Sequence, residues 1–570
     1  MEEIVPFAKT NFRNKGQVFG IKTDDRRRHM YVIGKTGTGK STLLKNMMIS
    51  DIRAGRGVGI IDPHGEFAET ILEYVPESRK NDVVYFNPAD MDFPIAFNIA
   101  ESVSPRERHL IASGLIGIFK KLWADSWGPR LEYVLRNTIL ALLECKDSTL
   151  LGIMRMLSDK EYRKHVLEQV TDPVIKSFWL DEFSKYSSKF EVEAIAPIQN
   201  KVGQFLTNPL IRNIVGQQRS SINIREIMDN KKILIVNVSK GRIGEDTSKL
   251  LGAMIITKIQ QAAMSRIDTP EKDREDFFLY VDEFQNFATE SFADILSEAR
   301  KYRLSLILAH QYVNQLIEEV RDAVIGNVGT LTLFRIGAED AEFFEKEFAP
   351  EVDAQNLVNL PNHKIYLKLM IDGVTSNAFS ADTLMPLSPE DVNFQEEIIL
   401  LSRNKYASNK KDVEDIITNW SKPMGVESLK VDVDIKLYGV TCSRCKKVTQ
   451  VPFEPDPKRS VFCKECYADV KKEQSKVLLK GLVKDTKIDM KQPLLLQKKD
   501  VQKLSASRES IYKIEDKVLD SSIKNESISL KDALKIGART FSGKNIYDEK
   551  IEKEDDKKSG IINPGDTIKF

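Results

Sequence analysis

The sequence predicts an α/β protein of several domains, and three observations lead to this fold class. Short apolar runs alternate with helical patterns over residues 30 to 98 and return after residue 231, which is typical of a parallel sheet covered by helices. Between these two parts, apolar residues recur at three- and four-residue spacing, which predicts a helical insertion. Two Cys-x-x-Cys pairs after residue 440 predict a further small unit.

Length and composition narrow the class of protein. A chain of 570 residues is too long for one hydrophobic core, and a hydrophobic content of 41% supports a sizeable one in each domain. With 85 Lys and Arg against 84 Asp and Glu, the chain has no overall field that attracts polyanions. We find no signal-peptide pattern and no apolar run long enough for a membrane span, so we expect a cytoplasmic protein without an intrinsic membrane anchor.

The predicted strands divide the core into two parts. The first part has strands at 30–33, 58–62 and 83–86, and the second has strands at 232–238, 277–282, 304–310, 330–334 and 364–370, the last followed by an Asp372-Gly373 turn. The resulting domains are the first part of the core at 1–100, the insertion at 101–225, the second part of the core at 226–388, a polar linker at 389–437, a zinc ribbon at 438–470 and a tail at 471–570. The tail is rich in Lys, Glu, Asp and Ser, a composition that predicts disorder.

A phosphate-binding loop follows the first predicted strand. The stretch from Gly34 to Ser41 fits the pattern G-x-x-x-x-G-K-[ST] between a strand and a helix. Its glycines allow backbone N–H groups to face phosphates, Lys40 would neutralise the β and γ phosphates, and Ser41 would bind Mg²⁺. The predicted nucleotide-binding residues here are Gly34, Lys35, Thr36, Gly37, Thr38, Gly39, Lys40, Ser41 and Thr42.

A pair of carboxylates follows another buried strand, in "FFLYVDEFQNF" at residues 277 to 287. Adjacent carboxylates after such a strand are costly unless a cation shares the space. We therefore predict that Asp282 supports Mg²⁺ and that Glu283 activates the attacking water. The alternative is a solvated acidic strand end.

Two other strand ends carry polar residues. Gln311, after "LSLILAH", is a candidate sensor that contacts both the γ-phosphate and water, and the alternative is a surface amide. Asp62, His64 and Glu66 follow the strand after the phosphate loop, and His64 has a purely structural role as its alternative. Asn409 to Asp412 match the guanine-reading pattern N-K-x-D, but no apolar strand precedes them, so we expect ATP as the nucleotide.

Taken together, these motifs make the chain similar to the HerA/FtsK-type P-loop ATPases, and closest to the TraD/TraG-like conjugative coupling ATPases of type IV secretion. The resemblance runs from about Gly20 to Asp382 and is carried by "HMYVIGKTGTGKSTLL", "GVGIIDPHGEF", "DVVYFNPADMDFPIAFN", "WGPRLEYVLRNTILALL", "LYVDEFQNFATESFADILSEARKY", "LILAHQY" and "GNVGTLTLFRIGAEDAEFF". It implies a RecA-like core of the ASCE class, a homo-hexameric ring that moves DNA by ATP hydrolysis, and association with a secretion or conjugation complex.

The resemblance also implies roles for single residues. Lys40 and Ser41 match the phosphate and metal positions, Asp282 and Glu283 the metal and base positions, and Gln311 the sensor. Arg335, in "LFRIG", matches an arginine finger, and the alternative is an ion pair with Glu339 or Asp340. The family usually begins with membrane helices, which this sequence lacks.

Other functions remain open at this point. The same fold could serve a secretion or pilus-assembly ATPase that acts on protein, a HerA-like DNA-processing ATPase, or a ring that binds nucleotide without catalysis. The pair Asp282 and Glu283 argues against the last of these.

The four C-terminal cysteines predict a Zn²⁺ site. Cys442 and Cys445 are separated from Cys463 and Cys466 by the 17 residues 446 to 462, within the range of the C-x₂-C-x₁₅₋₂₀-C-x₂-C pattern. Disulfides are the alternative, which a reducing cytoplasm disfavours. The basic residues of this unit would suit DNA phosphates, but a purely structural zinc clip is the other interpretation: Arg444, Lys446, Lys447, Lys458 and Arg459.

Overall fold

The architecture is described from a computed structural model of the chain. It describes residues 4–11, 16–101, 104–290, 292–389, 392–422, 438–451, 461 and 466. The chain divides into two compact units, residues 1–433 and 434–570. Cys463 and the predicted tail at 471–570 lie outside the described residues.

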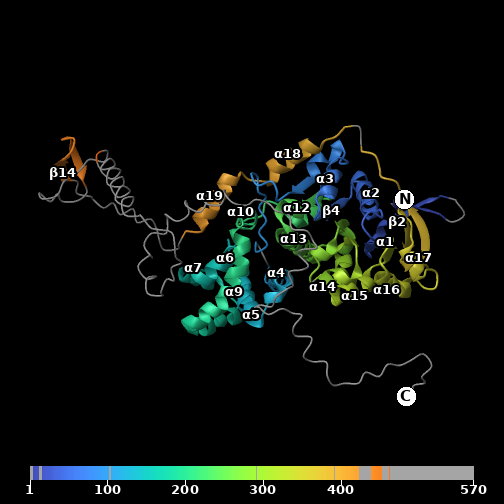
Figure 1. The fold of residues 1–570 in the computed structure, drawn as a ribbon, viewed down its shortest axis with the longest axis horizontal. Helices are drawn as coiled ribbons and strands as arrows, with labels where there is room; N and C mark the ends of the chain where they lie inside the picture. The colour runs from blue at the N-terminus through green and yellow to red at the C-terminus, as the bar shows by residue number, and fades with distance from the viewer. Residues whose placement is uncertain are drawn as a thin grey trace, which may run out of the picture. The chain divides into compact units, whose positions relative to one another are not determined.

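One sheet organises the described part of the first unit (Figure 1). It has eleven strands, in the order β2 (Val18–Lys22), β1 (Ile4–Thr10), β13 (Phe379–Thr383), β10 (Lys364–Lys368), β9 (Thr330–Leu333), β3 (Met30–Ile33), β8 (Leu304–His310), β7 (Phe277–Val281), β4 (Gly57–Asp62), β6 (Ile233–Asn237) and β5 (Val83–Phe86).

The seven strands from β9 to β5 are parallel, and every residue in them is buried. Parallel strands covered by helices on both faces consist of nearly continuous apolar residues, which is why these runs are visible in the sequence. The predicted α/β fold class is confirmed. The other four strands are antiparallel, and they extend the sheet at the β9 side.

Alternate residues of the strands pack into two cores on opposite faces of the sheet. Met30 and Val32 face a core with helices α2 (Lys40–Arg53), α3 (Glu66–Leu72) and α18 (Gln395–Tyr406). Tyr31 and Ile33 face the larger core, which continues into the helices of the other face. Outside the segment between β5 and β6, the helices that contribute to this core are α12 (Lys240–Ile243), α13 (Glu245–Ser265), α14 (Phe292–Glu298), α15 (Glu318–Asn327), α16 (Ala338–Phe348), α17 (Ala354–Val358), the end of α18 at Tyr406, and α19 (Lys410–Trp420).

The segment between β5 and β6 contains helices and no strand among its described residues. Figure 1 shows α5, α6, α7 and α9 of this segment gathered at one end of the first unit, whereas β2 and α17 lie at its opposite end. The helices are α4 (Arg108–Leu122), α5 (Pro129–Glu144), α6 (Gly152–Ser158), α7 (Lys160–Gln169), α8 (Pro173–Ser177), α9 (Ser188–Thr207), α10 (Pro209–Val215) and α11 (Ile224–Asp229).

The predicted linker is wrong for the part of it that the structure describes. Helix α18 packs on the edge strand β5, where Ile398 is buried and the Ser402 hydroxyl accepts the Tyr85 N–H over 2.9 Å. Helix α19 buries Val413 and Ile417. The polar composition hides these helices because only one narrow apolar face of each is buried.

The predicted turn at Asp372-Gly373 is confirmed. Both residues have positive φ, 51° and 81°, between the short strands β11 (Met370–Ile371) and β12 (Val374–Thr375). Asn-Gly and Asp-Gly pairs suit such hairpins because both positions require the left-handed region.

A buried ionic network fixes helix α2 against strand β7. Asp51 of α2 accepts two hydrogen bonds from the Arg26 guanidinium, at 2.7 and 2.8 Å, and one from the Tyr280 hydroxyl at 2.6 Å. Arg26, at the end of α1 (Thr23–Arg26), and Asp51 are both almost fully buried, so each charge depends on the other. This pairing holds the helix that follows the phosphate loop in register with the strand that carries the carboxylate pair.

None of the helices in the described residues combines the length and apolar character required to cross a bilayer.

Candidate nucleotide site and zinc unit

The phosphate loop connects β3 to α2 at the carboxyl edge of the sheet. Gly39 precedes the helix with φ of 117°, and a Cβ there would lie 3.1 Å from Nδ1 of His363. A Cβ on Gly34 would lie 2.4 Å from the Cβ of Phe334. Glycine is therefore required at both positions: at Gly39 by the backbone conformation, and at Gly34 by the close Phe334 side chain.

A cavity of about 410 Å³ lies over this loop and brings most of the predicted site residues together. Gly34, Lys35, Thr38 and Arg335 do not line it. The predicted residues that do are Thr36, Gly37, Gly39, Lys40, Ser41, Thr42, Asp282, Glu283 and Gln311, joined by Lys45, Asp62, His64, Glu66, Phe67 and His363.

The Lys40 ammonium is buried and turned toward its own loop. It donates to the carbonyl oxygens of Gly34, at 2.5 Å, and Lys35, at 3.3 Å. Burial lowers the pKa of Lys40, and the charges of Glu283 and Asp282 oppose that shift. A phosphate oxygen in the cavity would be a stronger acceptor than these carbonyls, since it carries charge.

Three carboxylates lie close together beside the loop. Burial, together with the nearby charges of Asp62 and Glu283, raises the pKa of Asp282 to about 7. Asp282 and Glu283 are each only 6% exposed. This excess of buried negative charge fits a divalent cation such as Mg²⁺, for which Ser41 would be a further oxygen ligand.

Asp62 and His64 differ in what they do in the fold. Asp62 is fully buried and accepts the backbone N–H groups of His64 and Ala68, so it caps the start of α3. The side chain of His64 is exposed and lines the cavity.

Glu283 is held by two glutamines. Its Oε1 accepts from Nε2 of Gln311 at 2.7 Å, and its Oε2 accepts from Nε2 of Gln285 at 2.5 Å. Oε1 of Gln311 in turn accepts the Thr36 hydroxyl at 3.0 Å. Glu283 also has φ of 47°, a left-handed conformation that is uncommon outside glycine and concentrated at functional sites.

Gln285 and His363 were not identified from the sequence. Gln285 lies two residues after the carboxylate pair in "DEFQNF", which was its only available signal. His363 comes from a segment more than 300 residues along the chain from the phosphate loop, with no motif around it. Only the fold brings it to the cavity.

Arg335 lies beside the loop without contacting the carboxylate pair. Its carbonyl accepts the Lys35 N–H at 2.8 Å, and its guanidinium donates to Oδ1 of Asn362 at 3.0 Å. The alternative ion pair does not form, because Asp340 accepts the Val313 N–H and Glu339 accepts from Asn314.

The two basic residues of the segment 239–246, which follows β6, have partners in the described structure. Lys240 donates to Oδ1 of Asn286 at 2.7 Å, and Arg242 pairs with Glu69 at 2.6 Å. Asn286 donates to the Glu283 carbonyl at 2.7 Å, so Lys240 supports the segment after the carboxylate pair.

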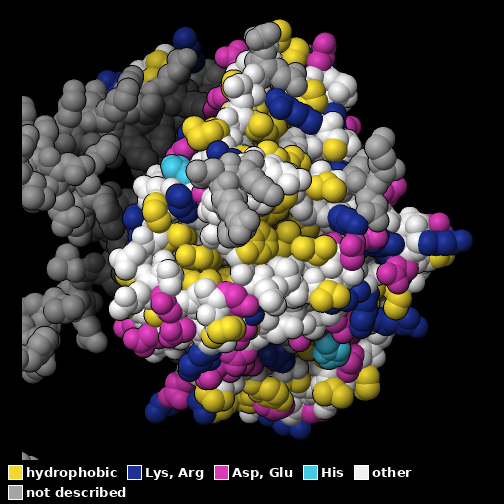
Figure 2. Space-filling view, turned by 90° about the vertical axis from the view of Figure 1, so that its right-hand side faces the viewer, with side chains coloured by type: hydrophobic (Ala, Val, Ile, Leu, Met, Phe, Trp, Pro, Cys, Tyr) yellow, Lys and Arg dark blue, Asp and Glu magenta, His cyan; other side chains and the backbone are white. Residues whose placement is uncertain are grey.

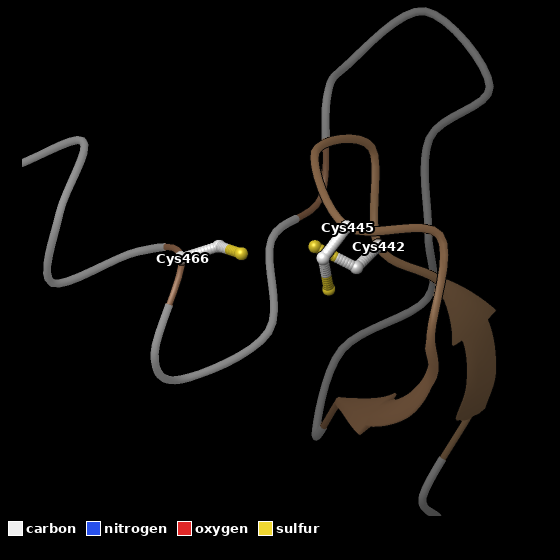
Figure 3. Close-up of side chains that lie close together, drawn as sticks. All are labelled: Cys442, Cys445 and Cys466. Atoms are coloured by element: carbon white, nitrogen blue, oxygen red, sulfur yellow. The ribbon is translucent and has the colours of Figure 1, made fainter.

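In the second unit, three of the four predicted zinc ligands come together. Figure 3 shows Cys442 and Cys445 on one turn, with Cys466 facing them from another segment. Their sulfur atoms all lie within 4.8 Å of one another, and none is in a disulfide. The turn follows β14 (Tyr438–Thr441) and precedes β15 (Val448–Val451). The fourth predicted ligand, Cys463, lies outside the described residues. Thiolates at this separation suit a tetrahedral Zn²⁺.

Comparison with known families supports the zinc site of the second unit. Residues 436–471 match a family described as "Probable treble clef zinc finger". The predicted Zn²⁺ is confirmed. The matched family is a treble clef, whereas the cysteine spacing alone predicted a zinc ribbon. A treble clef and a ribbon can use the same four ligands, so the cysteine spacing does not separate them.

The chain also resembles individual proteins. It is 19% identical over 361 residues to the type 4 coupling protein DotL of Legionella pneumophila, covering 53% of this chain and 46% of that protein. The aligned part is therefore less than half of that relative. Among solved structures, the plasmid coupling protein TrwB with the ATP analogue ADPNP has a TM-score of 0.49 and 17% identity, covering 65% of this chain and 87% of TrwB. VirB4 of Thermoanaerobacter pseudethanolicus has a TM-score of 0.46 and 16% identity, covering 69% of this chain and 98% of that one.

A family model covers more than half of the chain. Residues 14–349, which include the phosphate loop, the helical insertion, the carboxylate pair and Arg335, match the "Type IV secretion-system coupling protein DNA-binding domain". The protein therefore belongs to the family of type IV secretion-system coupling proteins defined by that domain.

Proposed function

We propose that this protein is an ATPase that moves DNA through a hexameric ring in conjugative transfer or type IV secretion. One observation carries the ATPase part of the proposal. The hydrogen bonds from Thr36 to Gln311 and from Gln311 to Glu283 connect the phosphate loop to the general base through the sensor.

Each residue has a chemical role in this proposal. Lys40 leaves its two carbonyl partners and binds the β and γ phosphates. Mg²⁺, when bound by Ser41 and Asp282, would neutralise charge on the phosphates. Glu283 takes a proton from the attacking water, and Gln311 holds the Glu283 carboxylate in place for that step.

Among the described residues of one chain, Lys40 is the cation of the cavity that does not pair with a carboxylate, which supports assembly into a ring that supplies another. Apart from Lys40, the only cation that lines the cavity among the described residues is Lys45, which lies 3.5 Å from Glu66. Arg335 is directed to Asn362, on the side of the loop away from Glu283. We therefore propose that Arg335 acts on the γ-phosphate of a neighbouring subunit.

DNA is the proposed substrate because the matched family is a DNA-binding domain. The distribution of charge on the protein is compatible with local contacts to DNA and not with a basic surface over a whole face. Figure 2 shows one face of the molecule, on which Lys and Arg side chains are interspersed with Asp and Glu. A ring would place its DNA contacts around a central channel and would need no basic outer surface.

The test is ATP hydrolysis by the purified protein with and without DNA. We expect DNA to stimulate hydrolysis, and Glu283→Gln to remove both the basal and the stimulated rate. Stimulation by a secreted protein but not by DNA would favour the secretion or pilus-assembly alternative. Absence of nucleotide binding would contradict the proposal as a whole.

A further inference from the structure

The cavity over the phosphate loop is lined both by His363 and by the carboxylates Asp282 and Glu283. The five strands next to the cavity stand in the sheet in the order β10, β9, β3, β8 and β7. His363 immediately precedes β10, which runs antiparallel to β9 and so starts at the edge where the phosphate loop lies. Asp282 and Glu283 follow β7, two strands beyond the loop on the other side.

The His363 backbone is fixed in a conformation that turns its ring to the loop. Its N–H donates to the Thr38 carbonyl at 2.9 Å, and its own carbonyl accepts the N–H and the hydroxyl of Thr383 at 2.9 and 3.2 Å. Its φ of 63° lies in the left-handed region, which a residue other than glycine rarely adopts. Nδ1 would lie only 3.1 Å from a Cβ on Gly39, so the ring lies against the loop itself.

The direction of the nucleotide follows from the proposed function, on which this inference rests. Hydrolysis requires the γ-phosphate to point toward Glu283, because Glu283 is the proposed base. Since the loop amides bind the phosphates between β3 and α2, the ribose and base must extend to the opposite side. His363 lies on that side, and its imidazole is exposed and lines the cavity.

We infer that the His363 imidazole stacks on the base of the bound nucleotide. Every nucleobase offers a π face, so stacking increases affinity without selecting adenine over guanine. The same contact forms with ADP and ATP, since it involves no phosphate. His363 is therefore a binding residue for the nucleoside part, distinct from the phosphate loop.

Binding constants for four ligands test this contact: ATP, ADP, GTP and inorganic tripolyphosphate, measured by calorimetry on the full chain. His363→Asn retains a residue that tolerates positive φ but removes the ring. We expect it to weaken the binding of ATP, ADP and GTP by about 5- to 150-fold each, as follows from the loss of one base–aromatic stack. Tripolyphosphate, which has no base, should bind within twofold of the wild type.

Two further variants complete the design. His363→Phe keeps an aromatic ring and should restore nucleotide affinity to within threefold of the wild type. His109→Asn changes an exposed histidine on α4 and is the control. Unchanged ATP affinity in His363→Asn would overturn the inference, and so would an equal loss for tripolyphosphate, which would indicate a phosphate contact instead. If the wild type binds tripolyphosphate but no nucleotide, or binds neither, the proposed ATP site itself is contradicted.

Discussion

Gln311 donates its side-chain N–H to Oε1 of Glu283 over 2.7 Å, while its own Oε1 accepts the Thr36 hydroxyl over 3.0 Å. Glu283 follows β7, Gln311 follows β8 and Thr36 follows β3, and these three strands are adjacent in the sheet. The amide therefore bridges the proposed base and the phosphate loop. A shift of Thr36 on nucleotide binding would reach the Glu283 carboxylate through this one side chain.

Gln311→Ala is expected to slow ATP hydrolysis by about 10- to 100-fold, because a base displaced by about 1 Å loses that much rate. The Kd for ATP should stay within threefold of the wild type, since Lys40 and the loop amides remain. Steady-state kinetics and equilibrium binding separate the two effects. Gln315→Ala, an exposed glutamine on the following turn, is the control, and equal rates in both variants would remove Gln311 from the mechanism.

Glu283→Gln is expected to retain ATP affinity while hydrolysis falls by about two to four orders of magnitude, because the amide cannot accept a proton from water. Lys40→Ala should show the opposite pattern, in which binding itself is weakened. Single-turnover hydrolysis with pre-bound ATP measures the first variant, and titration with ATP measures the second. A Glu283→Gln protein that hydrolyses ATP at the wild-type rate would show that another residue is the base.

Arg335→Ala should bind ATP and hydrolyse it at least about 10³-fold more slowly, as expected for loss of an arginine that acts in trans. Mixing it with Glu283→Gln should restore part of the activity, because some interfaces then combine an intact arginine with an intact base. Subunit exchange is checked by labelling the two variants with different fluorophores. No activity above that of the separate variants, with exchange verified, would exclude action in trans.

The sequence predicted the centre of the fold because burial there leaves a simple pattern. Strands β3, β7 and β8 are buried throughout and are followed by polar residues, so the sequence could predict that Lys40, Asp282 and Gln311 lie at one edge of the sheet. The outer strands β1, β2 and β13 were missed. They mix buried positions with partly or fully exposed ones, and β1 contains Pro6.

The same reasoning explains the missed parts of the site. Tertiary structure brings His363 to the cavity and Gln285 to the Glu283 carboxylate, and neither residue belongs to a spacing pattern. The composition over helices α18 and α19 predicts a linker because charged residues outnumber buried ones in both. Their buried anchors, such as Ile398 and Ile417, stand in short apolar runs flanked by charged and polar residues, so composition over a window concealed them.

Removal of Zn²⁺ should affect the second unit and leave the first unit unchanged. Purified protein is expected to contain one Zn²⁺ per chain, and a chelator should unfold the cysteine-bearing segment while ATP still binds to the first unit. Cys445→Ser should lose the metal, whereas Cys145→Ala should keep it, because Cys145 is a buried thiol in the first unit. Metal analysis and ATP titration before and after chelation give both readouts. A zinc content near zero in protein prepared without chelator would contradict the site.

Acid should destabilise the first unit partly through His29. Burial lowers its pKa to about 4, and its ring has a fixed tautomer: Nε2 donates to the Leu296 carbonyl and Nδ1 accepts the Leu306 N–H, both at 3.1 Å. Protonation of Nδ1 would remove that acceptor. Because the folded pKa is below the unfolded value of about 6.5, the stabilising contribution is complete above pH 6.5 and decreases as the pH falls toward 4.

At pH 5 the loss from His29 alone is expected to be about 2 kcal/mol relative to pH 7, since each pH step between the two pKa values costs about 1.4 kcal/mol. Urea unfolding at both pH values measures it. His29→Asn, which tolerates the φ of 63° at this position, should be less stable at pH 7 but should lose about 2 kcal/mol less than the wild type on acidification. His109→Asn, at an exposed histidine, should keep the wild-type pH dependence. Buried His310, whose pKa is lowered to about 3, contributes the same dependence in all three proteins and cancels in the comparison. If His29→Asn and the wild type lose the same stability between pH 7 and pH 5, His29 is not the group that titrates.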